Sequence, residues 1–308
     1  MKHPELPLRS PDTYSYTFIG FSAFYLFMTK GSGKSGGRRK FLLLILLSYF
    51  FNYVSLSAQS QRRHFRQHEI GLLGGISYYI GDINPFFHSR YPRPAGTFFY
   101  RFCPHYRYAF RFGFSAGMLY ANDRDFSNPV QKERNLNFRS PVYECAAQAE
   151  FNFVEYRLGH PKHIMSFYTF LGLGCFYFHP KGNIGNGWKS LPGLKTEGIS
   201  YSLIQISIPF GIGFKWSVTE NIGFHVEWGP RKTFTDFLDD VSTNYPLDLG
   251  FGKDASVRDL YSFRSTLAYD ARGTTRGNPR TKDWYFIYGF GINIRLPSPE
   301  GPCHGMSF

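Results

Sequence analysis

The clearest pattern in this chain is a strict alternation of apolar and polar residues between Leu203 and Asp240. Apolar side chains occupy every second position in residues 204–216 and again in residues 222–228, and the polar connection Thr219-Glu220-Asn221 separates the two runs. A period of two places one set of side chains in an apolar medium and the other in a polar or crowded one. Each run is longer than an ordinary soluble strand, so the pattern predicts two neighbouring walls of a transmembrane β-barrel.

Six further stretches show the same alternation or a nearly continuous apolar run. They cover residues 68–83, 97–102, 106–120, 142–156, 164–178 and 283–296. The predicted connections alternate between long and short, as in outer-membrane barrels whose two ends lie in the periplasm. An even strand number closes the sheet without a free edge. We therefore predict an all-β fold, a transmembrane antiparallel β-barrel of about eight strands with long extracellular loops and short periplasmic turns. A soluble β-sandwich is the alternative.

The faces of the central hairpin can be assigned from the alternation. Phe210 and Phe224 are predicted to face lipid, and Lys215 and Glu227 to face the lumen.

Composition and charge narrow the function classes. The chain has 308 residues, 19% of them aromatic, and 32 Gly, which suits a barrel with a bulky outer face and a small inner one. A mean hydropathy of -0.29 excludes a polytopic helical membrane protein. The formal charge is +13, and no basic-aromatic module indicates a nucleic-acid partner. The four cysteines lack metal-site spacing, and we expect no cofactor and no small-molecule substrate.

The N-terminal region reads as a targeting segment. From Met28, the basic stretch ending at Arg38-Arg39-Lys40 precedes an apolar run and small residues near Ala58, which together predict a signal peptide over residues 28–58. Residues 1–27 are then an upstream extension of the gene model. The predicted mature chain has a periplasmic segment at 59–67, the barrel at 68–296 and a tail at 297–308, and it resides in the outer membrane.

Charged residues collect on the predicted inward faces. The candidate interior network is Glu69, Arg107, Arg111, Glu144, Glu150, Lys215, His225, Glu227, Arg231 and Arg295. Because an eight-stranded barrel has room only for side chains, we expect these charges to pair and fill the lumen. The alternatives are an ion- or proton-conducting path and a catalytic His225–Glu227 pair, for which no nucleophile is evident.

Two other groups of residues suggest chemistry less strongly. An acidic run follows the hairpin and comprises Asp236, Asp239, Asp240, Asp248 and Asp254. We expect solvated loop charges and helix caps there rather than a cation site, because the spacing does not match a calcium loop. Cys145 and Cys175 lie at equal distances from residue 160, so they can face each other across neighbouring strands and form a disulfide.

Several segments resemble the PorG-type outer membrane protein family of Bacteroidota. They are HEIGLLGGISYYIGDINP, EFNFVEY, Lys195-Thr196-Glu197-Gly198, IPFGIGFK, EWGPRKTFTDFLDDVSTNY and DWYFIYGF, in order over residues 68–296. The resemblance implies a non-enzymatic component of the type IX secretion and gliding machinery. It also implies association with a periplasmic ring of PorK- and PorN-like proteins.

The candidate docking residues for such a ring are Arg62, Arg63 and Arg66, which would suit an acidic partner. The alternative function is an OmpA-like structural or adhesin barrel without a role in secretion.

Overall fold

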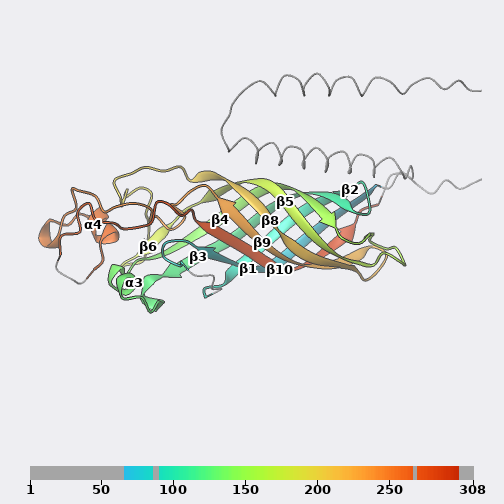
Figure 1. Cartoon of the computed structure of the whole chain (residues 1–308), viewed down its shortest axis with the longest axis horizontal. Coiled ribbons are helices and arrows are strands. Elements are labelled where there is room, and N and C mark those ends of the chain that lie inside the picture. The colour runs from blue at the N-terminus through green and yellow to red at the C-terminus, as the bar shows by residue number, and fades with distance from the viewer. Residues whose placement is uncertain (1–65, 86–89, 266–268, 298–308) are drawn as a thin grey trace, which may run out of the picture. The chain divides into compact units, whose positions relative to one another are not determined.

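Eight long antiparallel strands form a closed β-barrel (Figure 1). The computed structural model describes residues 66–85, 90–265 and 269–297. The barrel strands are β1 (Gln67–Ile80), β2 (Arg93–Cys103), β3 (Tyr108–Asn122), β4 (Asn137–Asn152), β5 (Met165–Phe178), β8 (Ile204–Ser217), β9 (Ile222–Thr233) and β10 (Trp284–Arg295). Each strand pairs with its neighbours in sequence, and β1 pairs with β10 to close the sheet. The predicted all-β fold, a closed antiparallel barrel of eight strands, is thereby confirmed.

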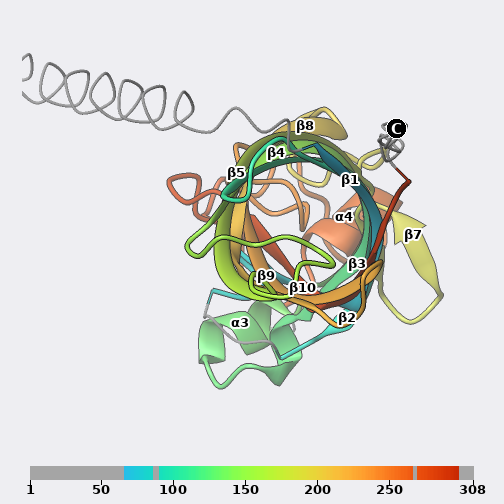
Figure 2. The ribbon, with the colours of Figure 1, turned by 90° about the vertical axis from the view of Figure 1, so that its right-hand side faces the viewer.

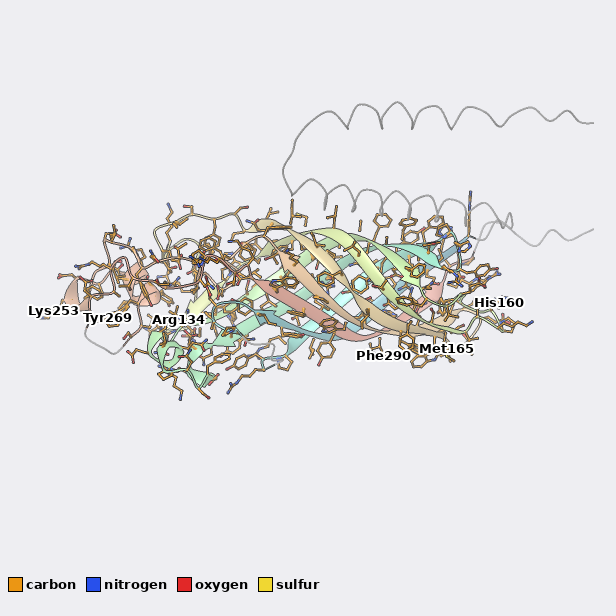
Figure 3. All side chains as sticks on the ribbon, in the orientation of Figure 1. Arg134, His160, Met165, Lys253, Tyr269 and Phe290 are labelled. Carbon is orange, nitrogen blue, oxygen red and sulfur yellow. The ribbon has the colours of Figure 1, made fainter. Side chains whose placement is uncertain are left out.

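The connections between strands differ strongly between the two ends of the barrel. We call the end with residues 104–107, 153–164 and 218–221 the turn end, and the end with residues 81–92, 123–136, 179–203 and 234–283 the loop end. Figure 3 shows His160 at the turn end, and Lys253 and Tyr269 in the outermost part of the loop end. The first and last strands both have their outer termini at the turn end. The view along the barrel shows a closed ring of strands (Figure 2).

The period of two separates the side chains into two faces. Outward-facing side chains form an apolar belt, in which Phe112, Leu171 and Ile212 are 56%, 61% and 59% exposed. Inward-facing positions alternate between large aromatic rings, such as Phe99 and Tyr168, and charged groups. Toward the loop end the interior becomes an apolar core that includes Leu119, Phe138, Phe176, Phe178 and Leu238.

The long loops carry their own secondary structure. A small hairpin of β6 (Lys181–Asn183) and β7 (Trp188–Ser190) extends the sheet beyond β4. Helix α3 (Pro129–Arg134) and helix α4 (Val257–Ser262), with the single-turn helices η1 (Asp123–Asp125) and η2 (Gly252–Asp254), complete the loop end. A second core of Tyr245, Leu249 and Ala271 lies among these loops.

The bounds of the strands differ in part from those predicted, most of all in β2, β3 and β4. Strand β2 begins at Arg93 rather than at residue 97, β3 begins at Tyr108 rather than at 106, and β4 spans Asn137–Asn152 rather than 142–156. In β4, Asn137 and Arg139 face outward and Phe138 and Ser140 face inward, so the alternation continues with polar outward residues. The sheet extends past the apolar belt. A prediction based on apolar outward residues therefore places the start of the strand too late.

The predicted segments at 1–27 and 28–58, most of 59–67, and residues 298–308 of the tail lie outside the described residues.

Candidate functional site

Buried charges fill the half of the barrel near the turn end. Glu150 lies at the centre: its Oε2 is 2.9 Å from Arg101 Nε and also accepts from Lys215 Nζ, and its Oε1 is 3.3 Å from Arg111 Nε. Arg101 Nη1 also donates to Glu69 Oε2 at 2.8 Å. All five side chains are at most 3% exposed. One carboxylate therefore balances three cations that come from three different strands.

Glu227 extends this cluster toward the opposite wall. It forms a two-pronged ion pair with Arg111, whose Nη2 lies 3.1 Å from Glu227 Oε1. The hydroxyl of Tyr168 donates to Glu227 Oε2 at 2.8 Å, and Gln148 Oε1 accepts from Arg111 Nε at 2.8 Å. Two-pronged guanidinium–carboxylate pairs fix geometry as well as charge, so these side chains connect β3, β4, β5 and β9 across the lumen.

A second buried pair lies closer to the loop end. Glu144 Oε2 is 3.2 Å from Arg231 Nε and accepts from the hydroxyl of Tyr285 at 2.8 Å. Ser207 Oγ donates to Glu144 Oε1 at 3.4 Å. Within the barrel strands that the structure describes, four buried carboxylates (Glu69, Glu144, Glu150, Glu227) thus meet four buried cations (Arg101, Arg111, Lys215, Arg231). An interior of zero net charge avoids the large cost of an unpaired buried charge.

His225 lies among these charges without a hydrogen bond of its own. It is fully buried, and neither ring nitrogen has a partner among the described residues. The ring contacts Phe99 edge-on, with centroids 5.3 Å apart. It also fills the space above Gly291, its partner on β10, where an added Cβ would lie 2.2 Å from His225 Cε1. His225 therefore acts as a packing residue in this interior.

The structure places most predicted network residues in the lumen, but two lie elsewhere. Arg107 belongs to the turn before β3, where its side chain is 44% exposed and 3.9 Å from Glu155, because β3 begins one residue later. Arg295 ends β10 opposite Glu69 and is half-buried at the rim. Sequence reasoning missed Arg101, which lies in the almost wholly aromatic run of β2 and gave no readable alternation. One signal could have identified it: Arg101 is the register partner of Glu69 across β1 and β2, and a buried Glu69 needs a cation close by.

The acidic run after β9 is largely buried, which corrects the expectation of solvated charges. Asp239 Oδ2 accepts from Tyr79 Oη at 2.5 Å and from Ile83 N at 3.2 Å. Asp283 Oδ1 accepts from the same hydroxyl at 3.0 Å, and its Oδ2 from Leu238 N at 2.9 Å. Burial raises the pKa of both carboxyls well above their usual range. These contacts fix the longest loop to the end of β1.

Asp240 and Glu197 hold the same loop to the preceding one. Arg276 Nη1 donates to Glu197 Oε1 at 2.8 Å, and Glu197 accepts from the backbone of Ser242 and Thr243 at 2.9 Å each. Asp240 accepts from the hydroxyls of Thr196 and Tyr201, the latter at 2.6 Å. Burial raises the pKa of Asp240 to about 6, and it raises that of Asp236 to about 6 as well. Asp248 and Asp254 remain exposed.

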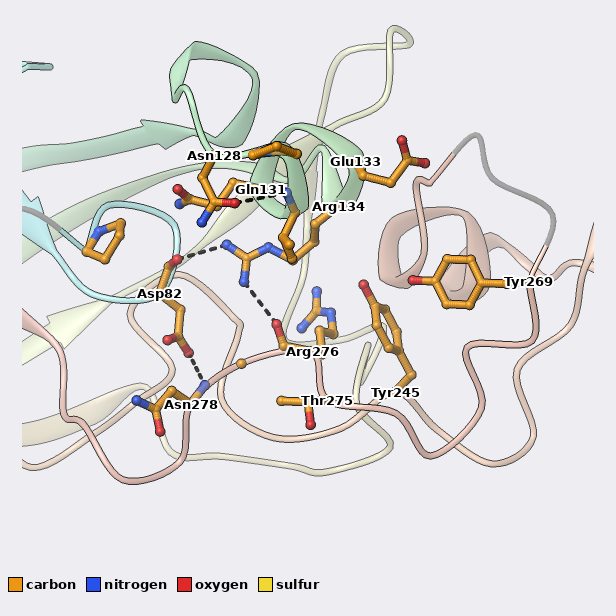
Figure 4. A pocket seen from close by; sticks show the side chains of 14 residues that line it. Asp82, Asn128, Gln131, Glu133, Arg134, Tyr245, Tyr269, Thr275, Arg276 and Asn278 are labelled. Carbon is orange, nitrogen blue, oxygen red and sulfur yellow. Dashed lines mark hydrogen bonds between the residues drawn. The ribbon is translucent and has the colours of Figure 1, made fainter.

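A cavity of about 670 Å³ opens between helix α3 and the longest loop (Figure 4). Arg134 crosses it, donating to the backbone oxygens of Asp82 at 2.8 Å and Arg276 at 2.9 Å and pairing with Asp123. The second arginine at the wall, Arg276, is held by Glu197. Both cations therefore pair with groups of the protein itself. The cavity is a gap between loops that these contacts hold together.

Further placements concern metals, helices and cysteines. Among the described residues, no group of three His, Cys, Asp or Glu side chains is arranged to hold a metal ion. None of the helices in the described part of the chain has the length and apolar character to cross a membrane. Cys145 and Cys175 are direct partners across β4 and β5, as their spacing suggested, and both thiols are free and outward-facing.

Comparisons with known proteins identify a family. No curated protein matches the chain. Among solved structures, Ail of Yersinia pestis bound to the heparin analogue sucrose octasulfate is 11% identical, with a TM-score of 0.37 over 75% of this chain and 99% of Ail. Neisserial surface protein A is 8% identical, with a TM-score of 0.37 over 74% and 97%. The N-terminal β-barrel domain of Pseudomonas aeruginosa OprF is 10% identical, with a TM-score of 0.32 over 75% and 100%.

A family model described as a domain of unknown function, DUF6089, matches residues 43–306, and the chain belongs to this family.

Proposed function

We propose that this protein is an outer-membrane barrel that acts by contact through its loop end, as a structural or adhesin-like protein without enzymatic activity. The observation that carries the proposal is the pairing of an apolar outer belt with a charge-balanced, side-chain-filled interior. A closed sheet with an apolar exterior satisfies its backbone internally and suits a bilayer. A lumen crossed by Arg111, Glu150 and Glu227 offers no open aqueous path for ions.

If the belt contacts lipid and the lumen is filled, only the two ends of the barrel are available to contact other molecules. The loop end is large, and its loops are fixed to one another by a partly buried ion pair at Arg134 and a buried one at Arg276. A braced surface loses little conformational entropy when it binds another molecule. Two of the three connections at the turn end, residues 104–107 and 218–221, have only four residues each. Contact through the loop end is accordingly the main proposed activity.

The test combines membrane fractionation with surface labelling of intact cells. An epitope inserted after Leu247, which is 79% exposed in the longest loop, should be reached by antibody on intact cells. The same epitope inserted after Glu220, in the turn between β8 and β9, should be reached only after the outer membrane is opened. The purified protein in planar bilayers should show no stable conductance. Recovery in the soluble fraction, or labelling at Glu220 on intact cells, would refute the proposal.

A second candidate function is the anchoring of a type IX secretion ring, which the PorG-type resemblance supports. The turn end would face the periplasm, and Arg66 is exposed immediately before β1. Arg62 and Arg63 lie outside the described residues. In this proposal, deleting the gene blocks type IX secretion, and replacing the three arginines with Glu weakens co-purification of PorK- and PorN-like proteins. Unchanged secretion in a deletion strain without a paralogue would rule it out.

A further inference from the structure

We propose that the outer surface of β3, β4 and the β6–β7 hairpin is a binding site for a phosphorylated glycolipid of the lipid A type. The inference rests on the proposed outer-membrane location. Five residues define this surface, which we call the Arg139 surface: Arg93, Tyr120, Arg139, Lys181 and Trp188. Tyr120, Arg139 and Lys181 are register partners on three adjacent strands, so their side chains follow one another across the sheet.

Aromatic rings hold the two arginines of this surface in place. The guanidinium carbon of Arg139 lies 4.5 Å from the ring centre of Trp188, and that of Arg93 lies 4.5 Å from the ring centre of Tyr120. The two rings meet edge to face, with centroids 6.2 Å apart. Cation–π contact orients a guanidinium without neutralising it. The surface therefore presents fixed, uncompensated positive charge.

These cations differ from the arginines that stabilise the lumen and the loops. Arg134, Arg231 and Arg276 are all committed to buried carboxylates. Arg93, Arg139 and Lys181 pair with no acidic side chain among the described residues. A cluster of three such cations attracts an anionic group, and its aromatic neighbours suit a ligand with a sugar or acyl portion.

The position of the Arg139 surface on the barrel indicates which kind of anionic ligand it would contact. Phe114, Tyr143 and Tyr177 form a row of outward rings across β3, β4 and β5, with centroids 6.4 and 6.5 Å apart. Such aromatic rows mark the membrane interface in outer-membrane barrels. Arg139 precedes Tyr143 by four positions on β4, which places it roughly 10 Å beyond that row, at the depth of lipid headgroups.

The wall on the other side of this aromatic row complements the charged surface. A shallow apolar depression of about 810 Å³ lies there, and small residues on adjacent strands form its floor. These residues are Gly113, Ala146, Ala147 and Gly174. A ligand with phosphate on its headgroup and several acyl chains would contact both features at once. Among anionic ligands, an outer-leaflet phosphoglycolipid has this combination.

The test uses the full-length protein, extracted in detergent, with diphosphoryl lipid A as the probe and dephosphorylated lipid A as its partner control. Binding is measured by native mass spectrometry and by thermal stabilisation. We expect a clear preference for the phosphorylated lipid. The double variant Arg139→Gln/Lys181→Gln should bind it about 25-fold more weakly, since each surface cation contributes about fivefold. The matched variant Lys162→Gln/Lys253→Gln removes the same charge at exposed positions elsewhere and should bind normally.

Each alternative outcome is informative. Equal binding of the two lipids, equal loss in both double variants, or equally tight binding of inorganic phosphate would overturn the inference. Tighter binding of a sulfated polysaccharide than of lipid A would also overturn it, because it would identify a soluble polyanion as the ligand. Recovery of the protein outside the outer membrane refutes the proposed function. Recovery in the outer membrane without lipid A selectivity refutes the lipid site alone.

Discussion

At the scale of single residues, the interior depends on close approach between backbone and side chain. Gly291 lets His225 lie against β10, and an added methyl group there would clash with the imidazole ring. Gly74 lies on the neighbouring strand β1, and a Cβ added there meets nothing within 4 Å. A side chain is therefore excluded at Gly291 and tolerated at Gly74, although both residues lie within barrel strands.

We expect Gly291→Ala to destabilise the barrel by about 1–3 kcal/mol, the usual cost of overfilling a packed interior. Gly74→Ala is the matched control and should be neutral or slightly stabilising. The midpoint of urea unfolding in detergent or lipid measures both. Equal midpoints for the two variants would contradict the assigned position of His225.

Glu150 is the most heavily engaged carboxylate in the interior. Its replacement by Gln would leave Arg101, Arg111 and Lys215 without a shared counter-charge, and breaking a buried pair costs about 3–5 kcal/mol. We expect Glu150→Gln to lower the unfolding midpoint strongly. Glu155→Gln at the turn end removes an exposed carboxylate 3.9 Å from Arg107 and should change stability by less than about 1 kcal/mol. A Glu150→Gln protein as stable as the wild type would show that the network is not required.

At the scale of the strands, the alternation in sequence specified which face each residue occupies. Ile212 points outward, while Lys215 and Glu227 are buried inside. The alternation no longer predicted the strand where the outward residues become polar, as at Arg139. The sheet continues there beyond the apolar belt. The bracing of the loops was also unpredictable. Asp239 and Asp283 share the hydroxyl of Tyr79 although they lie 160 and 204 residues from it, and no local pattern records such contacts.

An outward position in the belt should not tolerate charge. We expect Ile212→Arg to destabilise the barrel by roughly 2–4 kcal/mol, because in the proposed outer-membrane location the guanidinium would lie in the hydrocarbon region. Leu247→Arg, in the longest loop, should have no effect on assembly. Heat-modifiable migration on gels measures the assembled fraction of both variants. Full assembly of Ile212→Arg would contradict the outward assignment of this face.

At the scale of the whole molecule, the loop end should respond to pH. Burial raises the pKa of Asp240 to about 6, above that of an unfolded Asp near 3.9, so the folded state holds its proton more tightly. Stability from this group is therefore greatest below about pH 4 and falls as pH rises through 6, by at most about 3 kcal/mol. Hydrogen exchange of residues 234–283 should be slower at pH 5 than expected from pH 7 data after correction for intrinsic rates.

Asp240→Asn should flatten this pH dependence. The residue has a φ of 67°, a left-handed conformation that Asn adopts readily, so the variant removes the ionisation without new backbone strain. Asp248→Asn, at an exposed position paired with Arg258, is the control and should leave the profile unchanged. An Asp240→Asn profile identical to the wild type would assign the pH response to other groups.

The pairing of β1 with β10 also constrains the order of events during biogenesis. Gly75 on the first strand meets Gly289 on the last, so the ring closes between residues more than 200 positions apart. Until the final strand arrives, β1 and β9 each present an unsatisfied edge that can pair with other chains. Closure is therefore the last step, and the chain needs protection from aggregation until its final strand is available. A chain that ends before Trp284 would lack β10, so its sheet could not close and both edges would stay unpaired.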